Sequence, residues 1–194
     1  MEHSYRLWRH KLLPNVCQLD EFAGVEDVTS FEEGVELANG FPSNVTLRMS
    51  DRFPDDMLLA DNLANTNRLI VISAGLRRFL EDEGVQHIEF LPVTILDHKG
   101  RVASADYWIL NPVGLVDCLD LDKCQPEWDV IDETKVNHVK SFAMDTSRID
   151  ESRRLFRPRY FTKVVLIRED LANRISSQGF TGVQWRDLQE ATYL

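Results

Sequence analysis

Two stretches of the chain, 95 residues apart, show the same order of hydrophobic and polar positions. Residues 69–91 begin with the apolar run Leu69–Ile72, continue with apolar residues at helical spacing up to Gly84, and end in a second apolar run. Residues 164–186 repeat this order without a gap, with Gly179 in the place of Gly84. The pattern predicts an internally repeated strand-helix-strand unit within one fold.

Outside these stretches, short aromatic or β-branched runs between turn residues favour strands. The turn composition of Asp97–Gly100 predicts a hairpin that pairs 88–96 with 103–110. A helix is expected over Ser30–Asn39, where Ser30 and Glu33 form a capping-box pattern. We therefore predict an α+β fold with mixed and antiparallel sheets. Further expected strands are Tyr5–Trp8, Val45–Met49 and Val139–Met144, and the expected core residues are Phe90, Trp108, Ile167 and Trp185.

A length of 194 residues with 43% apolar residues fits a single domain over 1–194. It leaves open that residues 1–55 form a loosely attached acidic N-terminal lobe. The N-terminus has no apolar signal core, and three cysteines are an odd number, which favours reduced thiols over disulfides. We expect a cytoplasmic protein in which Cys17, Cys118 and Cys124 are structural.

The charge of the chain is unevenly distributed. The sequence has 22 basic and 32 acidic residues, a net charge of −10, which disfavours direct binding to nucleic acid. Residues 20–61 hold eleven acidic residues against Arg48 and Arg52, whereas residues 148–163 are predominantly basic. The segment Arg153–Tyr160 mixes arginine with aromatic residues, but the net charge argues against RNA as its ligand.

Motifs that would identify an enzyme are absent from the sequence, including glycine-rich phosphate loops, nucleophile elbows and HExxH. The best candidate for chemistry is the acidic run around Asp117, Asp120 and Asp122, which could serve a small metal-dependent enzyme. A solvated strand end explains the same residues. We therefore expect no catalytic residues, no metal and no cofactor.

The acidic N-terminal stretch is the better candidate for function. Its carboxylates, interspersed with Phe22, Phe31, Phe41 and Phe53, could combine electrostatic steering with aromatic anchors for a cationic protein. A solvated helix face with polar loops is the alternative interpretation. The candidate partner-binding residues are Glu26, Asp27, Glu32, Glu33, Glu36, Asp55 and Asp56.

Several sequence blocks in a fixed order carry a resemblance: Leu69–Ser73, Ile88–Pro92, Tyr107–Asn111 with Val116–Asp120, Leu155–Arg157, and Phe180–Val183. Over residues 40–188 the chain resembles the bacterial polymorphic-toxin immunity protein family of the myxobacterial type, formerly a domain of unknown function. The resemblance implies a non-enzymatic protein that binds a cognate toxin in the cytoplasm and blocks it. A basic toxin would match the acidic stretch. A general protein-binding adaptor fits the same features, and an exposed strand edge would permit a homodimer.

Overall fold

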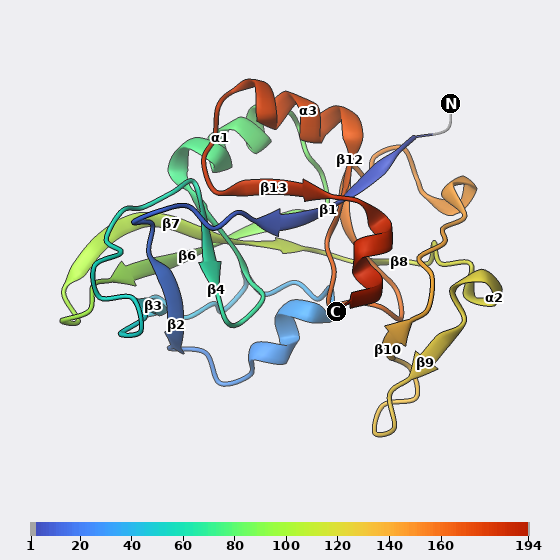
Figure 1. The fold of residues 1–194 in the computed structure, drawn as a ribbon, viewed down its shortest axis with the longest axis horizontal. Coiled ribbons are helices and arrows are strands. Elements are labelled where there is room, and N and C mark those ends of the chain that lie inside the picture. Colours follow the sequence, from blue (N-terminus) through green and yellow to red (C-terminus); the bar gives the residue numbers. More distant parts are fainter. Residues whose placement is uncertain (1–2, 194) are drawn as a thin grey trace.

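Three hydrophobic cores organise the computed structural model, which describes residues 3–193 (Figure 1). The barrel core fills a closed six-stranded barrel. The middle core packs the outer side of the barrel against a five-stranded sheet and two helices, and the outer core covers the other face of that sheet. The α+β class with mixed sheets is confirmed.

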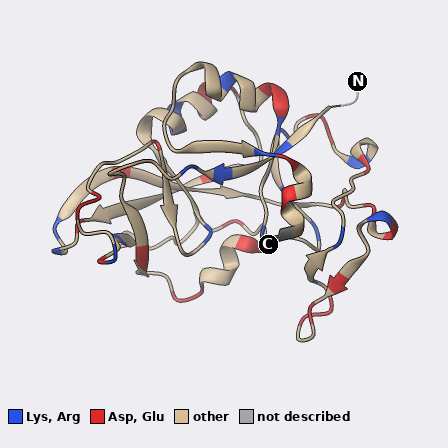
Figure 2. Cartoon of the chain, viewed as in Figure 1, with Lys and Arg blue, Asp and Glu red and all other residues tan. Residues whose placement is uncertain are grey.

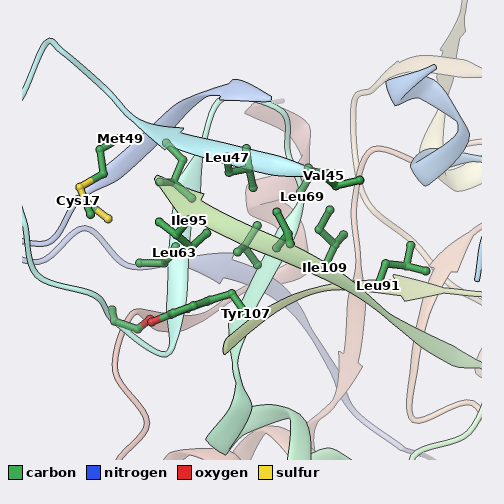
Figure 3. Packing of buried hydrophobic residues seen from close by; sticks show 14 of the residues in the cluster. Cys17, Val45, Leu47, Met49, Leu63, Leu69, Leu91, Ile95, Tyr107 and Ile109 are labelled. Carbon is green, nitrogen blue, oxygen red and sulfur yellow. The ribbon is translucent and has the colours of Figure 1, made fainter. Parts of the chain in front are cut away.

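The barrel combines antiparallel ladders with two parallel pairings, β2 with β4 and β3 with β6. Its interior is filled by aliphatic side chains such as Leu47, Leu63, Ile95 and Ile109 (Figure 3). The predicted hairpin is its longest ladder, because β6 and β7 pair across the turn at Asp97. In spatial order the strands are β2 (Gln18–Ala23), β3 (Thr46–Met49), β6 (Ile88–Leu96), β7 (Val102–Pro112), β5 (Ile70–Ser73) and β4 (Asn62–Asn65).

The five-stranded sheet is antiparallel except where β11 pairs with β8. Residues 1–55 contribute its second strand, β1, as well as β2 and β3 of the barrel. The division of the chain into domains stays a prediction. The strands, in spatial order, are β13 (Val183–Arg186), β1 (Tyr5–His10), β12 (Leu166–Arg168), β11 (Leu155–Pro158) and β8 (Leu115–Val116).

The two apolar runs that the sequence shows are buried on both faces. Within Leu69–Ile72, the odd-numbered residues belong to the barrel core and the even-numbered residues to the middle core. Within Val164–Ile167, the even-numbered residues belong to the outer core and the odd-numbered residues to the middle core. Since neighbouring side chains of a strand point to opposite faces, a continuous apolar run identifies a strand between two cores.

Both stretches of the expected repeat contain a strand, a helix and a strand. The helices are α1 (Ala74–Asp82) and α3 (Glu169–Ser177), which lie side by side in Figure 1 and share the middle core. In each stretch the two strands flank a third, antiparallel strand, which is β7 in the first and β1 in the second. One stretch belongs to the barrel and the other to the open sheet, so a duplicated unit is not confirmed.

The helix expected over Ser30–Asn39 is wrong. A short 3-10 helix, η1 (Val28–Glu32), begins one turn earlier because the Asp27 side chain, not that of Ser30, caps it. Gly34 then turns the chain with a φ of +68°. The backbone N–H groups of Leu37 and Ala38 donate to the carboxylate of Glu89, which replaces the helical hydrogen bonds.

The strand expected over Val139–Met144 is also wrong, because β10 (Val136–Val139) ends where that strand was to begin. The backbone of Phe142 bonds to the side-chain amide of Gln189 instead of a neighbouring strand. None of the helices within residues 3–193 is long and apolar enough to cross a membrane. The remaining elements are α2 (Leu121–Cys124), β9 (Pro126–Trp128), which pairs with β10, η2 (Thr146–Arg148) and η3 (Leu188–Tyr193).

Of the four expected core residues, Ile167 is fully buried. Phe90, Trp108 and Trp185 are half-buried at the border of the middle core. The guanidinium of Arg77 on α1 lies 5.3 Å from the ring centroid of Phe90 and 4.7 Å from that of Trp108. Both rings therefore pack against the middle core and also make a cation–π contact with Arg77.

Candidate interaction surface

The seven predicted partner-binding residues lie in two groups at opposite ends of β2. The η1 group follows the C-terminal end of β2, where Phe22 contacts Phe31 of η1. The loop group lies beside the N-terminal end, where Val16 forms a bridge with Leu58. Six strand residues span about 20 Å, so the two groups form two patches. The η1 group is Glu26, Asp27, Glu32, Glu33 and Glu36, and the loop group is Asp55 and Asp56.

The η1 group is held in place by aromatic packing. Phe31 is buried in the barrel core, and its ring meets those of Phe22 and Phe41 edge-on at 5.9 and 6.3 Å. The Asp27 carboxylate accepts hydrogen bonds from the backbone N–H and the hydroxyl of Thr29, and these bonds lower the pKa of Asp27. Three of the four phenylalanines expected as anchors therefore pack inward.

Basic neighbours partly neutralise the η1 group. Glu32 pairs with Arg68 at 3.9 Å, and Glu33 pairs with Lys135 at 3.7 Å. Within residues 3–193, the structure shows no ion pair for the other five carboxylates. These five are Glu26, Asp27, Glu36, Asp55 and Asp56. Figure 2 shows acidic residues on β2 and on the chain that leads from it to η1.

The loop group lies among exposed apolar side chains. Phe53 is 42% exposed, and Met57 and Leu58 beside it are exposed as well. Two turns fix the loop, because Phe53 N–H donates to the Ser50 carbonyl and Asp56 N–H donates to the Phe53 carbonyl, both at 3.1 Å. The loop therefore presents two carboxylates and apolar surface together.

Sequence reasoning missed the tip of the β9–β10 hairpin, which projects from the rest of the molecule in Figure 1. Val130 and Ile131 at this tip are 95% and 97% exposed. One carboxylate oxygen of Asp129 accepts the backbone N–H groups of Ile131 and Asp132 at 2.8 and 2.9 Å, which fixes the turn and lowers the pKa of Asp129. The signal in the sequence was this pair of aspartates flanking two apolar residues.

Four adjoining hollows in the protein surface extend in a row from the loop group to the hairpin. Their volumes are about 550, 70, 220 and 540 Å³, and each shares lining residues with the next. The first lies beside Phe53, Glu32 lines the third, and Glu33 and Trp128 line the fourth. We call this series the groove. The shared lining residues are, in order, His10 and Asn65, then Arg68 and Lys163, then Lys135, Tyr160 and Thr162.

One of the three aspartates in the acidic run at 117–122 has a structural role. Asp120 caps α2 by accepting the backbone N–H of Lys123, whose ammonium it also pairs with at 2.7 Å. Asp117 and Asp122 are exposed. In residues 3–193, no cluster of three or more His, Cys, Asp or Glu side chains is arranged to hold a metal ion. The three cysteines are buried and free.

Comparison with known proteins gives the family. The chain matches the Immunity protein family (Imm11) over residues 22–190. It therefore belongs to this immunity protein family, and the prediction of an immunity family from the sequence blocks is confirmed. The matched residues include the η1 group, the loop group, the hairpin and most of the groove. No curated protein matches the chain.

Proposed function

We propose that this protein protects its cell by binding a cognate toxin in the cytoplasm and blocking it, without chemistry of its own. The observation that carries this proposal is the set of five carboxylates that form no ion pair within residues 3–193, two of which share a fixed loop with exposed apolar side chains. Unpaired charge steers association, and apolar surface beside it supplies the buried contact of a stable complex.

A basic toxin is the partner that fits this surface. Carboxylates at both ends of β2 would attract it over a broad area, while Phe53 and the exposed hairpin tip would supply apolar contacts. The same charge would repel nucleic acid. A membrane has no part in this proposal. Strands β13 and β8 are the edges of the five-stranded sheet, and an edge strand can pair with that of a second copy. A homodimer is therefore a second assembly to test.

The test is co-expression with the product of the adjacent open reading frame, with cell survival and co-purification as readouts. Glu32 and Glu33 are unsuitable for charge reversal because both take part in ion pairs within the fold. The informative variants are E26K/E36K for the η1 group and D55K/D56K for the loop group. Each reverses two exposed or half-exposed carboxylates that have no ion pair in residues 3–193.

A matched control is D82K/E151K, which makes the same change in net charge. Both residues are exposed, and α1, which ends at Asp82, lies on the opposite side of the molecule from η1 in Figure 1. We expect at least one of the two test variants to lose protection and co-purification at an unchanged melting temperature, while the control keeps both. Full protection by both test variants would show that the acidic groups do not bind the toxin.

A further inference from the structure

The smallest hollow of the groove, about 70 Å³, has a cationic lining in a protein of net charge −10. Arg9 of β1, Arg68 of the β4–β5 turn, Arg157 of β11 and Lys163 all line it. Among the residues that the structure describes, only Arg68 of these four has a carboxylate within ion-pair distance, the one on Glu32. Three of the four cations that line the pocket therefore have no ion pair within residues 3–193.

Arg157 is the deepest of these cations, with only 2% of its surface exposed. Its Nη1 donates a 2.6 Å hydrogen bond to the Thr162 carbonyl, but its buried Nε has no partner in residues 3–193. Burial lowers the pKa of Arg157 to about 10, so the group is still charged at neutral pH. The charge of Glu32 offsets only part of this burial, and Arg157 forms no ion pair within residues 3–193. A buried cation in this situation is costly, which indicates a role beyond packing.

A second buried donor beside the pocket has no partner within residues 3–193 either. Trp8 is 4% exposed, lines the same hollow, and its buried indole N–H has no partner within residues 3–193. Buried polar groups in native proteins nearly always have hydrogen-bond partners. Both residues line the cationic hollow, so negative charge placed in the hollow would stabilise their unpaired buried donors.

The backbone holds Arg68 at this pocket in a conformation that arginine disfavours. Its φ is +56°, in the left-handed region. The side-chain amide of Asn65 fixes the turn, since Oδ1 accepts the Leu69 N–H at 2.9 Å and Nδ2 donates to the Leu69 carbonyl at 2.7 Å. Burial and the neighbouring charge of Arg68 lower the pKa of both Arg9 and Lys163, as expected of cations brought close together.

We propose that this pocket binds a phosphate group, either free inorganic phosphate or the phosphate of a small phosphorylated molecule. A phosphate offers several acceptor oxygens to converging N–H donors, and arginine matches its geometry. The hollow is large enough for one such group and too small for a whole nucleotide. The 550 Å³ hollow next to it, which shares His10 and Asn65, would take the organic part of a larger ligand.

The test is titration calorimetry of the full-length protein with inorganic phosphate and, separately, with adenosine monophosphate, in a phosphate-free buffer of low ionic strength. Arg68→Gln and Lys163→Gln remove one cation each from exposed and half-exposed positions. Because Lys163 also donates to the carbonyl of Asn137, the melting temperature of each variant is measured to check its fold. Arg78→Gln is the matched control, since Arg78 is exposed on α1 and does not line the pocket. We expect each pocket variant to bind at least about tenfold more weakly, and the control to bind like the wild type.

The two probes separate the two sources of phosphate. Equal affinities indicate free phosphate, and tighter binding of the monophosphate indicates a ligand that also fills the neighbouring hollow. Absence of binding by both probes at millimolar concentration would overturn the proposal, and so would equal binding by the wild type and both pocket variants. The readout needs no toxin, so the result is independent of the proposed neutralising function.

Discussion

The side-chain amide of Asn62 donates a 3.0 Å hydrogen bond to the backbone carbonyl of Gly182. Asn62 begins β4 of the barrel, and Gly182 immediately precedes β13 of the five-stranded sheet. The same carbonyl accepts the backbone N–H of Lys11 at 2.8 Å. This junction fixes how the barrel and the sheet meet.

Gly182→Ala should destabilise the protein severely. The residue has a φ of +75°, and a Cβ would lie well inside van der Waals contact of the Asn62 carbonyl oxygen and 3.0 Å from the Ala60 side chain. Backbone strain and the steric clash together predict a loss of about 3 kcal/mol or more in the free energy of unfolding, measured by denaturant titration.

Gly179→Ala is the matched control for this substitution. Gly179 has nearly the same φ, +76°, but no atom lies within 4 Å of an added Cβ. Only the conformational cost applies, about 1 kcal/mol. Equal losses for the two variants would show that the close approach to Asn62 is unimportant.

Glu83→Ala should remove the ionic contact between the two long helices and so destabilise the protein. Glu83 follows α1, and its nearly buried carboxylate accepts a hydrogen bond from Arg174 of α3 at 2.8 Å and pairs with Arg154 at 3.4 Å. Its removal leaves the half-buried Arg154 with a weaker partner, Asp170 at 3.7 Å. We expect a loss of about 3 kcal/mol in thermal or denaturant unfolding.

Glu81→Ala provides the comparison on the same helix. Glu81 pairs with Arg77 at 2.9 Å in an exposed i,i+4 arrangement. Such pairs contribute about 0.3–0.5 kcal/mol. If Glu81→Ala proved as harmful as Glu83→Ala, the proposed link between α1 and α3 would be refuted.

Asp97→Asn should change the acid sensitivity of the protein. The Asp97 carboxylate accepts the backbone N–H groups of Lys99 and Arg101 and the Nε of Arg101, and these bonds lower its pKa to about 2. A carboxyl whose folded pKa lies below its unfolded value of about 3.9 stabilises the fold above that pH, and this contribution disappears as the pH falls through about 2.

The denaturation midpoint of Asp97→Asn should therefore be lower than that of the wild type at pH 7, and the two should converge between pH 4 and pH 2. A difference that stays constant across this range would mean that the hydrogen bonds do not depend on the charge of Asp97.

The three cysteines should resist alkylation in the folded protein. All are buried, and burial raises the pKa of Cys17 and Cys118 to about 12 and also raises the pKa of Cys124. Because the thiolate is the reactive form, iodoacetamide at pH 8 should leave the native protein unmodified and label all three after denaturation, as read by mass spectrometry. Rapid labelling of one thiol in native protein would contradict this.

The local pattern of the sequence predicted the strands that lie between two cores. Leu69–Ile72 and Val164–Ile167 are apolar at every position because both of their faces are covered. Closure of the barrel could not be predicted in this way. It depends on the parallel pairings of β2 with β4 and β3 with β6, which join residues far apart in the sequence and have no local signal.

The candidate site was predictable in its charges and not in its geometry. The sequence identified seven carboxylates, but the ion pairs of Glu32 and Glu33 with Arg68 and Lys135 depend on tertiary contacts. Similarly, the burial of Phe31 could not be read from its polar neighbours. The cationic pocket draws on β1, β11 and the β4–β5 turn, so no continuous segment of the chain carried it.

Trp8 links this pocket to the middle core, because its ring meets that of Trp185 edge-on with a centroid separation of 5.0 Å. An indole with one edge on a ligand pocket and its ring in a rigid core has emission that responds to a change in local charge and hydrogen bonding. Phosphate binding in the proposed pocket should therefore change the emission of Trp8, one of the four tryptophans of the chain, and needs no added label to be followed.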